Sequence, residues 1–86
     1  MKDDQIIPLS QTNIGDKVEL TTLTIDGTIR RRLLDLGFVP GAIVKTVQKS
    51  PLKDPIAFRV SHTTIALRKD ESDHIFGKII ERNDAL

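Results

Sequence analysis

The chain has 86 residues, of which 38% are hydrophobic and 29% are charged, and its formal net charge at pH 7 is +1. This length allows one small domain and leaves little room for a deep active-site cleft. The small net charge argues against a nucleic-acid binder driven by electrostatics, and the lack of cysteine excludes disulfides, thiolate metal sites and cysteine nucleophiles.

The N-terminal sequence MKDDQIIPLS carries acids and lacks the apolar run of a signal peptide. No segment of the chain approaches the roughly 18 apolar residues of a membrane-spanning helix. We therefore expect a cytoplasmic protein that does not insert into a membrane, and the lack of cysteine fits a reducing compartment. Residues 1–8 are expected to form a flexible lead-in, because MKDDQ is polar.

The first predicted strand is followed by a turn and a short helix. Residues 17–23, KVELTTL, alternate between apolar and polar side chains, as a half-buried strand does. The Asp-Gly pair at residues 26–27 favours a turn. Thr28 is then expected to cap a helix over residues 29–36.

The predicted helix has one apolar stripe. At about 100° per residue, Ile29, Leu33 and Leu36 share one side of the helix and should face the core. Gly37 follows directly and should end the helix with a positive φ. Pro40-Gly41 predicts a second turn, which leads into the next strand.

Four more strands are predicted in the second half of the chain. They are expected at residues 42–49, 56–61, 64–68 and 76–81. The second and third of these should form a hairpin, residues 69–75 a turn or one helical turn, and Gly77 suggests a bulge. Five short strands and one helix after the first strand predict a mainly β fold, a small barrel. We place this domain at residues 9–82 and a tail at residues 83–86.

The sequence offers little catalytic chemistry. His62 and His74 lie in predicted turns without the spacing of a metal helix, and the serines lack a nucleophile-elbow context. We therefore expect no enzymatic activity and no required cofactor. A weak site for a divalent transition metal, using His62 or His74 with a carboxylate, stays open as an alternative.

Three consecutive arginines open the predicted helix. Cations in the first turn of a helix oppose its dipole, so a purely structural sequence would favour acids there. Arg30 and Arg31 lie beside Leu34, which is off the apolar stripe, and Arg31 can pair with Asp35 at i, i+4. An off-stripe leucine flanked by arginines is typical of a partner-binding surface. The alternatives are solubilising charge with Leu34 packed under a loop, and a nucleic-acid site.

The loop SPLKDP, residues 50–55, contains two prolines that restrict its conformation. It either connects two strands as a rigid crossover or presents Leu52 at its tip as a preorganised contact.

Four motifs occur in a characteristic order: LSQTNIGDKVEL, RRRLLDLGFVPGA, SPLKDPIAF and IALRKDESDHI. In this order they resemble the FeoA family, the ferrous iron transport protein A family, from about Leu9 to Ile79. The resemblance implies an SH3-like β-barrel and a cytoplasmic accessory protein, not an enzyme. The implied partner is FeoB, the membrane GTPase that carries ferrous iron. Lys53 departs from the family, in which a glycine is common at this place.

We thus expect a regulator that binds a FeoB-like transporter through Arg30, Arg31 and Leu34, with Leu52 as a second contact. The second hypothesis is a transition-metal-binding or metal-sensing module, and the third is a nucleic-acid-binding small barrel. Exposed strand edges also allow an oligomer.

Overall fold

The computed structural model describes residues 5–82, so residues 1–4 of the expected lead-in and the expected tail at residues 83–86 lie outside the described part of the chain. Within residues 5–82 the structure has six strands, one ten-residue helix, one short helix and a 3-10 turn. Their bounds are β1 Ile6–Pro8, η1 Leu9–Gln11, β2 Lys17–Leu23, α1 Gly27–Leu36, β3 Ile43–Lys49, β4 Ile56–Val60, β5 Thr63–Leu67, α2 Lys69–Ser72 and β6 Ile75–Glu81.

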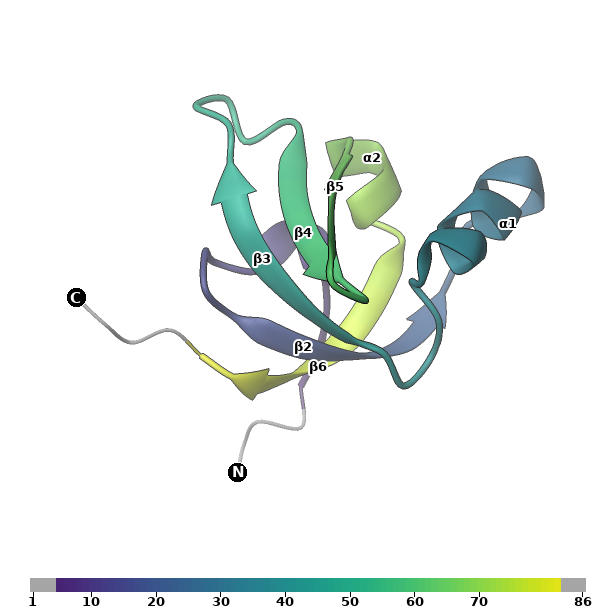
Figure 1. The fold of residues 1–86 in the computed structure, drawn as a ribbon, viewed down its shortest axis with the longest axis horizontal. Coiled ribbons are helices and arrows are strands. Elements are labelled where there is room, and N and C mark those ends of the chain that lie inside the picture. Colours follow the sequence, from purple (N-terminus) through teal and green to yellow (C-terminus); the bar gives the residue numbers. More distant parts are fainter. Residues whose placement is uncertain (1–4, 83–86) are drawn as a thin grey trace.

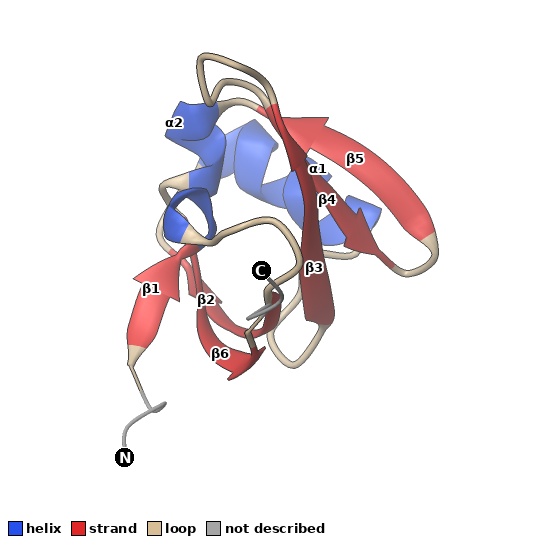
Figure 2. Cartoon of the chain, turned by 90° about the vertical axis from the view of Figure 1, so that its left-hand side faces the viewer, coloured by secondary structure: helices blue, strands red, loops and turns tan. Residues whose placement is uncertain are grey.

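The strands form one antiparallel sheet in the order β1-β6-β2-β3-β4-β5, which curls around the core (Figure 1, Figure 2). The helix α1 stands to one side of this barrel, next to β5. The mainly β, small-barrel fold expected from the sequence is thereby confirmed, and all five expected strands are present.

The sixth strand, β1, occupies residues 6–8, where a flexible lead-in was expected. Ile7 lies opposite Gly77 of β6 and is half-buried. The expectation is wrong at these residues because a three-residue strand is too short to show an alternating pattern. Its conformation depends on pairing with β6, which is distant in sequence.

The core is built from the inward positions of the strands, together with Leu9 of η1, Leu33 of α1 and Phe38, which follows α1. It consists of Leu9, Val18, Leu20, Leu23, Leu33, Phe38, Val44, Ile56, Phe58, Val60, Leu67, Ile75 and Ile79. Buried and exposed residues alternate most clearly along β4, as the sequence pattern predicted.

The predicted hairpin is formed by β4 and β5. Val60 lies opposite Thr63, so the loop has two residues, Ser61 and His62. Both have positive φ, 52° and 66°, which is the type I′ turn that matches the twist of paired strands.

The bulge predicted at Gly77 lies on the strand opposite it. Leu20 is paired with Gly77 and Thr22 with Phe76, so Thr21 is the extra residue and belongs to β2. Gly77 itself lies against the backbone of β2.

Candidate partner-binding surface

The helix α1 begins earlier than predicted and has a different residue before it. It starts at Gly27, which has φ of 75°, and is preceded by extended Asp26. The expected capping role of Thr28 is therefore wrong. The expected C-terminus is confirmed, because Gly37 is left-handed at φ 112° and its N–H donates to Leu34 O at 3.1 Å.

The helix faces the barrel with a different side from the one predicted. Leu33 is buried and Leu34 half-buried against the core, whereas Ile29 is 43% and Leu36 37% exposed. The inward side thus runs through positions 30, 33, 34 and 37. The expected stripe of Ile29, Leu33 and Leu36 is correct only at Leu33, and the expectation that Leu34 avoids the core is wrong.

Arg30 explains this rotation of the helix. Its Nη1 donates a hydrogen bond of 3.0 Å to the carbonyl oxygen of Leu23, the last residue of β2. A buried carbonyl without a partner costs free energy, and a charged donor satisfies it well. The spacing of apolar residues along the helix does not predict an arginine that faces the barrel to bond a backbone carbonyl.

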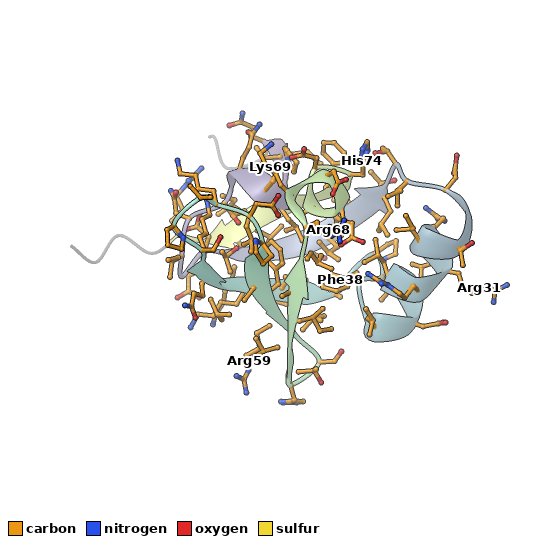
Figure 3. The ribbon with its side chains drawn as sticks, turned by 90° about the horizontal axis from the view of Figure 1, so that it is seen from above. Arg31, Phe38, Arg59, Arg68, Lys69 and His74 are labelled. Atoms are coloured by element: carbon orange, nitrogen blue, oxygen red, sulfur yellow. The ribbon has the colours of Figure 1, made fainter. Side chains whose placement is uncertain are left out.

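The other two arginines differ in their surroundings. Arg32 Nη2 lies 3.1 Å from Glu71 Oε2 of α2 and forms an ion pair. Arg31 extends away from the barrel into solvent (Figure 3). Within residues 5–82 it forms neither a hydrogen bond nor an ion pair, so the expected pair with Asp35 is not formed.

The structure brings three of the four predicted contact residues together. Arg30, Arg31 and Leu34 line one shallow concavity on α1, together with Gly27 and Asp35. The fourth, Leu52, lies on the β3–β4 loop, which is on the opposite side of the barrel from α1 (Figure 1). One flat surface therefore cannot touch all four at once.

The β3–β4 loop nevertheless presents Leu52 in a defined position. Its side chain is 88% exposed, and the flanking Lys53 has a positive φ of 63°. Lys53 N donates to Ser50 O at 2.7 Å, and the carboxylate of Asp54 accepts a 3.0 Å bond from the backbone N–H of Lys69. These bonds hold the loop against the start of α2.

The two histidines lie in different loops of the barrel. His62 is in the β4–β5 turn, and His74 Nδ1 lies 3.1 Å from Thr24 Oγ1. Among residues 5–82 no group of three or more His, Cys, Asp or Glu side chains is placed to hold a metal ion.

A groove that the sequence did not reveal separates α1 from β5 and α2. It has a volume of about 360 Å³, and we call it the β5 groove. Its apolar part consists of Ile25, Ile29 and Ala66, and its rim of four charged residues, Arg32, Arg68, Asp70 and Glu71. The residues that line it come from two segments about 40 positions apart in the chain, so no local sequence motif predicts the groove.

The short helix α2 is held to η1 by a polar cluster around Asp73. Ser10 donates a hydrogen bond to Asp73 Oδ1, and Lys69 Nζ lies 3.3 Å from Oδ2. The Ser10 hydrogen bond, supported by the charge of Lys69, lowers the pKa of the Asp73 carboxyl, against the opposing effect of partial burial.

We expect Ser10→Ala to raise the pKa of Asp73 toward the usual aspartate value of about 3.9. A lowered native pKa stabilises the fold above the unfolded pKa, and this contribution is lost as the pH falls through the native pKa. The variant should therefore lose less of its stability on acidification. A carboxyl-carbon NMR titration of both proteins measures the shift, and Ser10→Thr, which keeps the hydroxyl, is the control. An identical Asp73 titration in Ser10→Ala would refute the role given to this hydrogen bond.

The sequence is similar to proteins of ferrous iron transport. Residues 7–79 match the family model of the FeoA domain. The Fe(2+) transport protein A/Fe(2+) transporter FeoB fusion protein of Porphyromonas gingivalis is 32% identical over 75 residues, which are 87% of this chain and 9% of that protein. The chain thus spans a small part of that relative.

Two solved structures extend the comparison to the fold. The FeoA protein of Chlorobium tepidum is 33% identical and superimposes with a TM-score of 0.82 over 91% of this chain and 74% of that one. FeoA of Stenotrophomonas maltophilia, described as an SH3 domain protein complexed with zinc, is 29% identical, with a TM-score of 0.73 over 83% and 88% of the two chains.

The barrel with its lateral helix is therefore an SH3-like domain. The chain belongs to the FeoA family, a family of small domains of ferrous iron transport. None of the helices within residues 5–82 is long and apolar enough to cross a membrane.

Proposed function

We propose that this protein is a cytoplasmic accessory protein of a ferrous iron uptake system and that it binds the membrane GTPase transporter FeoB. The observation that supports this most directly is the Porphyromonas gingivalis relative, in which a FeoA part and a FeoB part form one chain. A fusion of two proteins is most useful where the separate proteins act in contact, because it raises their effective concentration.

The proposed contact surface is the outer side of α1, with Arg31 at its centre. Arg31 is exposed and unpaired within the described residues, so binding an acidic partner breaks no internal ion pair. Arg30 and Leu34, whose inward contacts fix the helix on the barrel, form the floor of the same concavity. Leu52 remains a proposed second contact, reached by a different part of the partner.

The test is a titration of the protein against the full-length transporter in nanodiscs, with GDP and with a non-hydrolysable GTP analogue. We expect saturable binding that Arg31→Glu weakens at least about tenfold, which corresponds to about 1.4 kcal/mol. Arg59→Glu is the matched control, since Arg59 is also an exposed arginine but lies on β4, far from α1 (Figure 3).

Equal weakening by both charge reversals would show that net charge, and not the α1 surface, controls binding. No binding of the wild-type protein in either nucleotide state would overturn the proposed function itself. Leu34→Asp is unsuitable as a probe of this surface, because Leu34 packs against the core and its loss also destabilises the domain.

A further inference from the structure

Strand β5 is an open edge of the sheet. It pairs with β4 on one side, and no strand formed by residues 5–82 pairs with its other side. In a hairpin with a two-residue loop, the first pair, Val60 with Thr63, is hydrogen-bonded, and bonded and non-bonded pairs then alternate. The backbone N–H and C=O groups of Thr64 and Ala66 therefore point away from β4. Among residues 5–82 neither residue forms a backbone bond outside the β4–β5 pairing.

The two edges of the sheet differ in how well they are protected. The other edge, β1, has three residues and ends at Pro8. β5 has five residues, Thr-Thr-Ile-Ala-Leu, with neither a charge nor a proline. Short length, charge and proline are the usual features that prevent an edge strand from pairing with another chain. β5 lacks all three, and although α1 stands beside it, the β5 groove leaves space between the helix and the strand.

The β5 groove supplies a binding pocket beside this edge. Ala66 lies on both the edge and the groove, and Ile25 and Ile29 form the apolar wall across from it. This wall suits one aliphatic side chain of an added strand, since alternate residues of a strand point to the same side.

The charged rim of the groove favours a ligand without net charge. The formal charges of its two arginines and two acidic residues sum to zero, and both carboxylate oxygens of Glu71 already have partners. Glu71 Oε2 pairs with Arg32 at 3.1 Å, and Oε1 accepts the backbone N–H of Arg68 at 3.1 Å. Neither a strongly acidic nor a strongly basic segment would gain from this rim.

The position of α1 limits the ligand to a single strand. At one end of the edge, the turn after α1 touches the β4–β5 hairpin, where a Cβ on Gly37 would come within 3.1 Å of Ser61 Oγ. At the other end, Arg32 of α1 is bridged to α2. The space left between α1 and this edge is the β5 groove of about 360 Å³, which suits one extended segment better than the whole sheet of another copy of this protein.

We propose that the β5 edge and the β5 groove bind a short, uncharged, extended segment of the transporter, which adds to the sheet as a further strand and places an aliphatic side chain against Ile25 and Ile29. This proposal rests on the proposed function and gives it a binding mode. Main-chain bonds to Thr64 and Ala66 supply affinity, and the apolar pocket supplies selectivity.

The first test is hydrogen–deuterium exchange of the full chain, alone and with the transporter in nanodiscs. The outward amides of Thr64 and Ala66 should exchange rapidly in the free protein and become protected at least about tenfold in the complex. The amides of Thr63 and Ile65, which donate to β4, serve as internal controls and should stay protected in both states. A complex in which Thr64 and Ala66 exchange as fast as in the free protein would overturn the proposal.

The second test is Ala66→Pro, which removes one outward N–H at an edge position where proline is tolerated. We expect at least tenfold weaker binding to the transporter, and a clearly smaller loss for Ala66→Ser, which keeps the N–H and only makes the groove lining more polar. Unchanged binding of Ala66→Pro would overturn the strand addition and leave the proposed function standing. If the wild-type protein does not bind the transporter at all, both the strand addition and the proposed function are overturned. If the wild-type protein is a dimer and Ala66→Pro is a monomer, the β5 edge pairs with a second copy of this protein, and the proposal is also overturned.

Discussion

Replacing Gly77 with alanine should destabilise the domain by about 3 kcal/mol, since overpacking a well-packed core costs typically 1–3 kcal/mol and more where backbone is involved. A Cβ at this position would lie 2.3 Å from Val18 Cγ1 and 2.7 Å from the carbonyl oxygen of Glu19. The Val18 side chain can rotate, but the Glu19 carbonyl belongs to the β2 backbone and cannot move without disturbing the sheet. Urea denaturation of both proteins measures the loss as a lower midpoint at unchanged slope.

Gly41→Ala is the matched control for this effect. Gly41 has φ of 93°, but apart from its two chain neighbours nothing lies within 4 Å of the place that a Cβ would take, so alanine there meets only the left-handed backbone penalty. We expect a loss of about 1–2 kcal/mol in this control. If Gly77→Ala proves no more harmful than Gly41→Ala, the close approach of β6 to β2 is not what requires a glycine.

The strands and turns of this domain could be predicted because their signals are local. Alternation along residues 17–23 and 56–60 and the glycine after α1 indicate their conformations without knowledge of the rest of the chain. β1 could not be predicted, because only its pairing with β6 makes residues 6–8 a strand. Its three residues have no pattern of their own.

The candidate site was predictable in part. The arginine run marked α1 as unusual, and Arg31 is indeed exposed on it. The orientation of the helix was not predictable, because the apolar pattern gave no weight to the bond from Arg30 to Leu23 O. The β5 groove was missed for a related reason. Its walls come from α1, β5 and α2, and only the fold brings these elements together.

Phe38→Ala should have the largest effect of all, a loss of about 4 kcal/mol, within the range of 3–5 kcal/mol measured for buried phenylalanines. Phe38 is fully buried and lies between the barrel and α1 (Figure 3), and its N–H donates to Leu33 O at 3.0 Å. At about 0.05–0.15 kcal/mol per residue, a domain of this size has only about 4–13 kcal/mol of stability. The variant should therefore be near its unfolding limit at 37 °C, whereas Val39→Ala, at the exposed neighbouring position, should change the melting temperature little.

The same substitution separates the stability of the barrel from the placement of α1. Phe38 is the first residue after the helix that reaches the core, so its truncation leaves Leu33 as the one fully buried side chain that α1 itself contributes. At 10 °C, with the barrel still folded, amides of residues 30–36 should exchange faster while those of β2 and β6 stay protected. Transporter binding should then weaken in step with α1, because both the outer side of the helix and the wall of the β5 groove depend on its position. Uniformly faster exchange over the whole domain would show instead that α1 and the barrel unfold as one unit.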